Sequence, residues 1–181
     1  MKRNEIAKII LASIAVTGGV FVFAALPGLA EAFAPYLKKQ RYLNSGQLKK
    51  SLNKLAIGGF VGITQDGNKT VLKLTKAGMQ KVLTFKLDDM QIKRQKRWDR
   101  KWRIVMFDIP EKFKQKRDAL VQKLGEIGFI RIQKSVWICP FPCEDEIFFI
   151  AELYEVREYL RMITAEDIDR EENLLKAFNL R

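Results

Sequence analysis

The chain has 181 residues, and 48% of them are hydrophobic, which is enough for one packed domain or two small ones. Its formal net charge is +12, and it contains no histidine. The absence of histidine excludes Ser-His-Asp and Cys-His catalysis as well as histidine-ligated zinc. A strongly basic chain of this kind is typical of a protein that binds a polyanion.

The positive charge is concentrated in the first part of the chain. Residues 1–103 carry 21 basic and 6 acidic side chains, whereas residues 104–181 carry 12 basic and 15 acidic side chains. This asymmetry indicates one part that meets a polyanion and another part with a different task. Nucleic acid is the commonest polyanion, and an anionic membrane surface is the alternative.

The two cysteines of the chain, Cys139 and Cys143, lie close together in the sequence. They lack the CxxC spacing of zinc ligands and there is no second pair, so we expect no zinc site. A disulfide between them, across the intervening turn, is an alternative. A reducing compartment is the simpler interpretation, and we therefore expect a cytoplasmic protein.

The N-terminal segment contains a long apolar run at residues 9–30. Its length would allow a membrane span or, with basic residues before it, a signal peptide. However, Gly18 and Gly19 divide the run, Pro27 interrupts its second part, and basic residues flank both ends. We therefore predict two buried helices, at about 4–17 and 20–37, and expect no insertion into a membrane.

A basic helix is predicted next, because Asn44-Ser45 can cap its start near Gly46 and Gly58-Gly59 ends it. Its apolar face carries three leucines at helical spacing, Leu48, Leu52 and Leu55. The remaining arc carries the polar side chains Lys49, Lys50, Asn53 and Lys54. On an isolated helix, such a face would simply be solvated.

The context of this helix favours DNA binding. Two strand-like runs, at 60–64 and 70–74, flank an Asp66-Gly67 turn signal, and Thr75 can cap a further helix. Two helices, a basic third helix, a hairpin and a closing helix follow the order of a winged helix-turn-helix, whose third helix enters the major groove. We predict that double-stranded DNA is contacted by Lys49, Lys50, Asn53 and Lys54, with Lys69 at the hairpin tip reaching a phosphate.

Residues 86–101 form a predicted basic linker, and residues 93–101 within it are the densest basic run in the chain. The predicted phosphate contacts in it are Lys93, Arg94, Lys96 and Arg97, which would make DNA binding strongly dependent on salt. The alternative is a linker that is simply solvated. We expect Trp98 and Trp102 to pack against a domain rather than to stack on bases.

The residues from 102 onward alternate between strand and helix patterns. Strands are predicted at 102–108, 129–133, 135–139 and 158–163, and helices at 113–126 and 144–155, and the tail at 170–181 is predicted to end in a short helix. The order βαββαβ is the ferredoxin-like arrangement, and small domains of this kind often gain core by dimerising. The predicted fold class is therefore α+β, with a winged-helix domain at 1–85, the basic linker, and a ferredoxin-like dimerisation domain at 102–181.

Three segments of this second domain carry a family resemblance: Trp102 to Glu111 with Lys116-Arg117 after it, Gly128-Phe129, and Gln133 to Ile138. They resemble the central domain of PaaX-type transcriptional repressors, which is itself similar to the small CRISPR adaptation protein, the second universal Cas protein. PaaX-type proteins also carry an N-terminal winged helix, so the resemblance extends over essentially the whole chain. Longer members have a further domain and respond to an aromatic acyl-CoA, and we do not expect that response in a chain of this length.

Asp108 is the candidate for chemistry. The resemblance implies a metal-binding nuclease residue at this position, where two such aspartates would meet across a dimer, and Mg²⁺ is a cation suited to carboxylates. Its sequence neighbours Glu111 and Asp118 make a thin set of ligands. The preferred interpretation is therefore that Asp108 caps the next helix or pairs with Arg103, Lys134 or a basic residue of a second copy.

We therefore predict a homodimeric, DNA-binding transcriptional repressor of PaaX type, without a cofactor. We do not expect an enzyme. The alternative is a CRISPR adaptation-type subunit with a weak Mg²⁺-dependent endonuclease activity or a role in spacer integration. A third hypothesis is a membrane-anchored basic protein held by residues 9–30.

Overall fold

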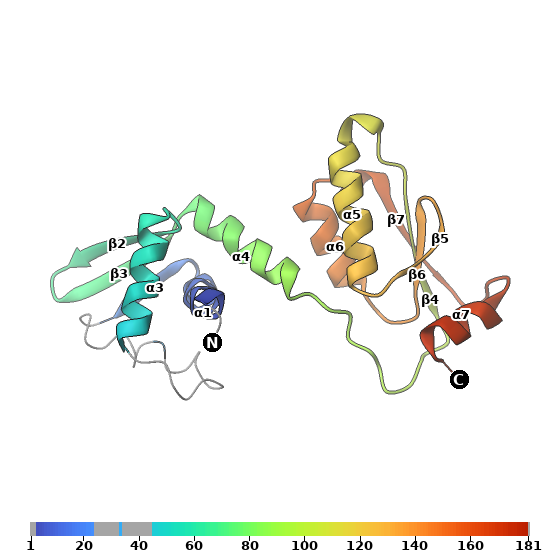
Figure 1. Cartoon of the computed structure of the whole chain (residues 1–181), viewed down its shortest axis with the longest axis horizontal. Coiled ribbons are helices and arrows are strands. Elements are labelled where there is room, and N and C mark those ends of the chain that lie inside the picture. The colour runs from blue at the N-terminus through green and yellow to red at the C-terminus, as the bar shows by residue number, and fades with distance from the viewer. Residues whose placement is uncertain (1–2, 24–32, 34–44, 181) are drawn as a thin grey trace. The chain divides into compact units, whose positions relative to one another are not determined.

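The computed structural model describes residues 3–23, 33 and 45–180, and the chain divides into two compact units, Met1–Asp88 and Asp89–Arg181. Figure 1 shows the helices and strands of both units. Each unit has a hydrophobic core of its own.

The first unit contains α1 (Arg3–Val16), β1 (Val20–Phe23), α3 (Ser45–Ile57), β2 (Val61–Asp66), β3 (Lys69–Leu74) and α4 (Lys76–Asp88). Its three strands form one antiparallel sheet in the order β1-β3-β2. The core joins aliphatic side chains of α1 and α3 to this sheet, and it includes Ile10, Ile14, Leu48, Leu52 and Leu72. The burial of one face of each helix holds the unit together.

Helix α1 confirms the helix predicted at about 4–17, and Gly18 and Gly19 end it as the sequence indicates. Both glycines have positive φ, 74° and 84°, which is a conformation that glycine adopts without steric cost. Within the described part of the chain, no helix is long and apolar enough to cross a membrane.

Strand β1 corrects the prediction of a helix at about 20–37, because Val20–Phe23 pair antiparallel with β3. The two-glycine turn reverses the chain, and the Gly19 carbonyl accepts a hydrogen bond from the Leu74 N–H at 2.8 Å. Branched and aromatic residues also alternate here, which suits a strand with Phe21 buried and its neighbours exposed. The rest of the predicted helix lies largely outside the described residues.

The hairpin predicted from the Asp-Gly signal is confirmed. Strands β2 and β3 pair in continuous register, with Asp66 opposite Lys69. Gly67, with a φ of 55°, and Asn68 form the two-residue connection between them. Such a short connection fixes which residues of the two strands face each other.

Thr75 caps α4, as the sequence predicts. Its Oγ1 accepts a hydrogen bond from the Gly78 N–H at 3.0 Å and donates one to the Gly59 carbonyl at 2.6 Å. The cap satisfies one of the free N–H groups at the helix start. It also ties α4 to the turn that follows α3.

The second unit contains β4 (Trp102–Phe107), α5 (Lys114–Glu126), β5 (Ile130–Gln133), β6 (Val136–Cys139), α6 (Glu144–Leu153), β7 (Leu160–Ala165) and α7 (Glu171–Phe178). Short 3₁₀ turns at Glu111–Phe113 and Arg157–Tyr159 precede α5 and β7. The four strands form an antiparallel sheet in the order β5-β6-β4-β7. The order βαββαβ with β4 and β6 in the centre is the ferredoxin-like arrangement.

The two faces of this sheet are covered by different helices. Figure 1 shows α5 and α6 on one side of the sheet and α7 on the other. Side chains alternate along β4, so that Val105 points to the first face while Trp102 points to the second. On the second face, Trp102 and Ile138 pack against Leu174 and Phe178 of α7 in one cluster. The sheet is therefore buried on both faces where α7 lies.

Candidate nucleic-acid interface

Helix α3 presents a basic face to solvent. Its leucines are buried in the core of the first unit, which leaves the opposite arc exposed. That arc carries all four residues that the sequence singles out, Lys49, Lys50, Asn53 and Lys54, and each is exposed. Residues four apart are neighbours on a helix, so Lys49 lies beside Asn53 and Lys50 beside Lys54. The described residues place no carboxylate in an ion pair with any of these lysines.

The hairpin adds one cation to the same unit. Lys69 is the first residue of β3, directly after the turn, and its side chain is exposed. Asp66 is opposite it in the register and is exposed as well, which lowers the net charge of the hairpin tip. Lys69 is therefore exposed directly after the hairpin turn, and its contact with a phosphate stays a prediction.

The predicted contacts in the basic segment belong to the second unit. Lys93, Arg94, Lys96 and Arg97 are exposed, on a segment without helix or strand between α4 and β4. The structure therefore brings together the four residues of α3, and the four residues of the basic segment belong to the other unit, with the ferredoxin-like sheet.

The start of this second unit is anchored by a buried arginine. The Arg103 guanidinium donates two hydrogen bonds to the Asp99 carboxylate, at 2.8 and 2.6 Å, and one to the Lys101 carbonyl at 2.9 Å. This pairing holds the pKa of the Asp99 carboxyl below its usual range. The last residues before β4 are thus held against the sheet by charge-assisted hydrogen bonds.

Two tryptophans strengthen the same anchor. The Trp98 ring lies 4.9 Å from the Trp102 ring, and its Nε1 donates to the Lys101 carbonyl at 3.2 Å. Trp102 is buried and donates through its Nε1 to Glu171 Oε1 at 2.8 Å. The prediction that both tryptophans pack against a domain is confirmed.

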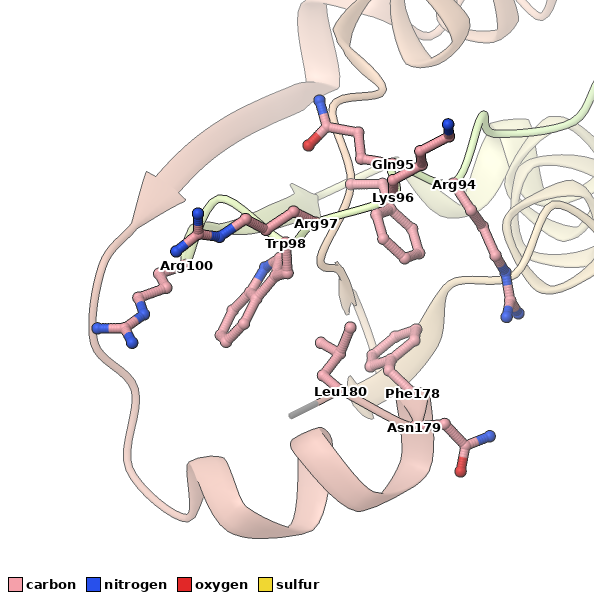
Figure 2. A pocket seen from close by; sticks show the side chains of 10 residues that line it. Arg94, Gln95, Lys96, Arg97, Trp98, Arg100, Phe178, Asn179 and Leu180 are labelled. Carbon is pink, nitrogen blue, oxygen red and sulfur yellow. The ribbon is translucent and has the colours of Figure 1, made fainter.

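The anchored segment forms one wall of a pocket of about 490 Å³ within the second unit. The other walls come from the turn after β6 and from the end of α7 (Figure 2). The pocket is lined by Arg94, Gln95, Lys96, Arg97, Trp98, Arg100, Phe141, Phe178, Asn179 and Leu180. The sequence patterns alone do not predict this pocket. One sequence signal could have indicated it: Trp98 and Asp99 each lie four residues before their partners, Trp102 and Arg103. This spacing indicates a segment anchored to the domain rather than a free linker.

Asp108 lies directly after β4, and its side chain is exposed. Its N–H donates to the Tyr159 carbonyl at 3.0 Å, which fixes the backbone at the end of the strand. The 3₁₀ turn that follows has no side-chain cap, and Arg103 is occupied by Asp99. Within the described residues, Asp108 therefore neither caps the next helix nor pairs with Arg103 or Lys134, and pairing with a second copy stays a prediction.

The acidic neighbours of Asp108 are bound to basic side chains. Glu111 accepts from Arg117 at 2.8 Å, and Asp118 accepts from Lys114 at 2.5 Å. These partners lower the pKa of both carboxyls. In the described part of the chain, no three acidic, cysteine or histidine side chains are grouped so that they could hold a metal. A single chain does not offer a fitting Mg²⁺ site there, and the metal stays a prediction that needs a second copy.

Comparison with protein families identifies the second unit. Residues 95–177 match the model described as the PaaX protein central Cas2-like domain. The fold is thus that of a Cas2-like domain, and the domain is similar to the one in the centre of PaaX proteins. The resemblance seen in the sequence is confirmed for these residues.

Among solved structures, the uncharacterized protein Rv0674 from Mycobacterium tuberculosis is similar at 18% sequence identity, with a TM-score of 0.39. The similarity covers 86% of this chain and 59% of that protein, so the chain spans less than two thirds of the length of this relative. Comparison with curated proteins found no match.

Proposed function

We propose that the chain is a DNA-binding transcriptional repressor of PaaX type that acts as a homodimer. The observation that carries this proposal is the exposed basic face of α3, in a chain whose other unit matches the PaaX central domain. Similarity of one unit to the PaaX central domain and a basic helix face on the other unit are independent indications of the same partner, double-stranded DNA.

The arrangement of the first unit supports a winged helix. Helix α3 is followed at once by the β2–β3 hairpin, and β3 lies in the centre of the sheet between β1 and β2. In this interpretation α3 is the recognition helix and the hairpin is the wing. Lys49, Lys50 and Lys54 would contact phosphates or guanine edges, and Asn53 is suited to an adenine edge.

A dimer surface is available on the sheet of the second unit. Met106 is 37% exposed and Ile163 is 45% exposed. Both point to the face that α7 covers only in part, because Ile163 is opposite Ile104 in the register and Met106 is two residues further along β4. Two copies that meet on this face would bury these side chains. A small domain is stabilised by such additional burial of apolar surface.

Charge reversal on α3 tests the DNA-binding proposal. The probe is a labelled duplex that carries the DNA upstream of the protein's own coding sequence. We expect the double variant Lys50→Glu/Lys54→Glu to bind this duplex about 100-fold more weakly in a gel-shift assay, because two groove contacts become repulsive. The matched control is Lys134→Glu/Lys176→Glu, which makes the same change of charge at two exposed positions of the second unit. Equal losses in the two variants would contradict the proposal.

The same duplex tests the alternative of a Mg²⁺-dependent endonuclease, which the exposed carboxylate of Asp108 favours. We expect binding without cleavage, both with Mg²⁺ and with EDTA. Cleavage that requires Mg²⁺ and disappears in Asp108→Ala would establish the nuclease instead, since carboxylates are the ligands that Mg²⁺ prefers.

A further inference from the structure

The pocket of the second unit combines two kinds of lining. Phe141, Phe178, Trp98 and Leu180 supply apolar surface, and Figure 2 shows Trp98, Phe178 and Leu180 pointing into one common space. The rim supplies four cations, Arg94, Lys96, Arg97 and Arg100, and two amides, Gln95 and Asn179. None of the ten lining residues carries a carboxylate side chain. A site of this composition favours a ligand that is part apolar ring and part anion.

The positive charge of the rim is not neutralised by the described residues. All four cations are exposed, and none of them forms an ion pair there. Two acidic side chains, one in the basic segment and one on α7, already have partners. Asp99 binds Arg103, and Glu171 accepts a hydrogen bond from Trp102. Four like charges around one opening attract an anion from solution.

The part of the pocket wall formed by Trp98 and Arg100 is also held in place before any ligand arrives. Hydrogen bonds from Arg103 to Asp99 and from the Trp98 ring to the Lys101 carbonyl fix the segment between them. Arg100, inside this segment, has a left-handed backbone with a φ of 59°. Such a conformation costs free energy in a residue other than glycine and persists only where its surroundings hold it. A wall that is already ordered binds a ligand without a further loss of chain entropy.

We propose that this pocket binds a nucleoside monophosphate. The base lies against the part of the Trp98 ring that faces the pocket, and the phosphate lies at the arginines beside Trp98. The phosphate of a nucleotide carries a charge of about −1.5 to −2 at pH 7, which suits a rim of four cations better than the single charge of a plain aromatic acid does. The volume of about 490 Å³ lies in the range of small-molecule sites.

A free nucleotide suits the pocket better than duplex DNA does. The bases of a duplex are stacked on each other, so their faces are not available to an aromatic wall unless a base is flipped out, which costs free energy. This inference goes beyond the proposed repressor function and does not depend on it, since the site lies in the second unit and is tested without DNA.

The test is calorimetric titration of the full chain with each of the four common nucleoside monophosphates, with the matching nucleosides, and with inorganic phosphate. We expect at least one monophosphate to bind about tenfold more tightly than its nucleoside and than phosphate alone, because base stacking and phosphate contacts both contribute. A monophosphate that binds no more tightly than inorganic phosphate would overturn the proposal in favour of a simple anion site.

Variants locate the site. Arg97→Gln/Arg100→Gln should weaken monophosphate binding about tenfold while leaving nucleoside binding unchanged, because only the phosphate contacts are lost. The control Arg131→Gln removes an exposed arginine of β5 outside the pocket and should leave binding unchanged. Trp98→Leu, verified as folded by circular dichroism, should weaken the monophosphate and not the phosphate. An equal loss in Arg131→Gln, or no loss in the arginine pair, would overturn the proposal.

Discussion

Arg103 connects three separate segments at the start of the second unit. It is 6% exposed, and besides Asp99 it reaches the Pro140 carbonyl at 3.3 Å and the Glu144 carboxylate at 3.7 Å. A buried guanidinium is costly unless its charge and its N–H groups are matched, and here most of them are. The same side chain thus holds the basic segment, strand β4 and the turn between β6 and α6 together, which also shapes the pocket wall.

The partner of this arginine gives a prediction about acid stability. Arg103 lowers the pKa of Asp99, so the pairing contributes its full free energy above the unfolded pKa of about 3.9 and loses it as the pH falls through the lower folded pKa. We expect Asp99→Asn to lower the free energy of unfolding by about 1–3 kcal/mol at pH 7 and by much less near pH 3. Urea unfolding at the two pH values measures this.

Asp118→Asn is the control for that experiment. Asp118 is also paired with a basic side chain, Lys114, but this pair lies on the exposed side of α5, where solvent screens the interaction. Its substitution should change the unfolding free energy less than Asp99→Asn does. A difference between wild type and Asp99→Asn that stays constant from pH 7 to pH 3 would show that Arg103 does not stabilise the Asp99 carboxylate.

The two helices α4 and α5 both contain a glycine, but in opposite packing environments. A Cβ at Gly78 of α4 would lie 2.0 Å from the Phe60 carbonyl oxygen, a backbone atom that has little room to move. A Cβ at Gly125 of α5 would lie 3.9 Å from the Trp137 ring, which is an ordinary contact. Glycine is therefore required at the first position by the approach of α4 to the chain after α3, and it is merely tolerated at the second.

This contrast predicts opposite effects of the same substitution. Gly78→Ala should destabilise the first unit by about 2 kcal/mol or more, because the backbone must shift to accept the methyl group. Gly125→Ala should leave stability unchanged or raise it by up to about 1 kcal/mol, because alanine is the better helix former. Thermal unfolding followed by circular dichroism measures both. A destabilising Gly125→Ala, or a neutral Gly78→Ala, would show that the packing at these glycines is different from that described.

For the molecule as a whole, the proposed dimer depends on the sheet face with Ile163. We expect the wild-type chain to sediment as a dimer and Ile163→Glu to sediment as a monomer, because a buried carboxylate at the interface is costly. The control is Phe148→Glu, which changes an exposed apolar side chain on α6, on the other side of the sheet, to the same residue. A monomeric wild type, or a dimer that survives Ile163→Glu, would rule out this interface.

Most secondary structure in this protein follows from local patterns. The caps, turns and spacings that the sequence shows correctly place the hairpin, the Thr75 cap and the strands and helices of the ferredoxin-like sheet. Helix α3 is the clearest case, because three leucines at helical spacing decide which side is buried and therefore which lysines are exposed. Strand β1 is the exception, since an apolar run after two glycines suits a helix as well as a strand.

The sequence by itself therefore determined the α+β class, the basic face of α3 and the resemblance to the PaaX central domain, because each follows from patterns among residues that are close together in the sequence. Only the tertiary structure decided that Val20–Phe23 is a strand, since its partner is Lys73 to Thr70 in β3. It also decided that the basic segment forms a pocket with Phe178 and Leu180, which lie about 80 residues later in the sequence. Contacts between segments that are distant in the sequence depend on how the sheet and its helices pack, and local periodicity does not predict them.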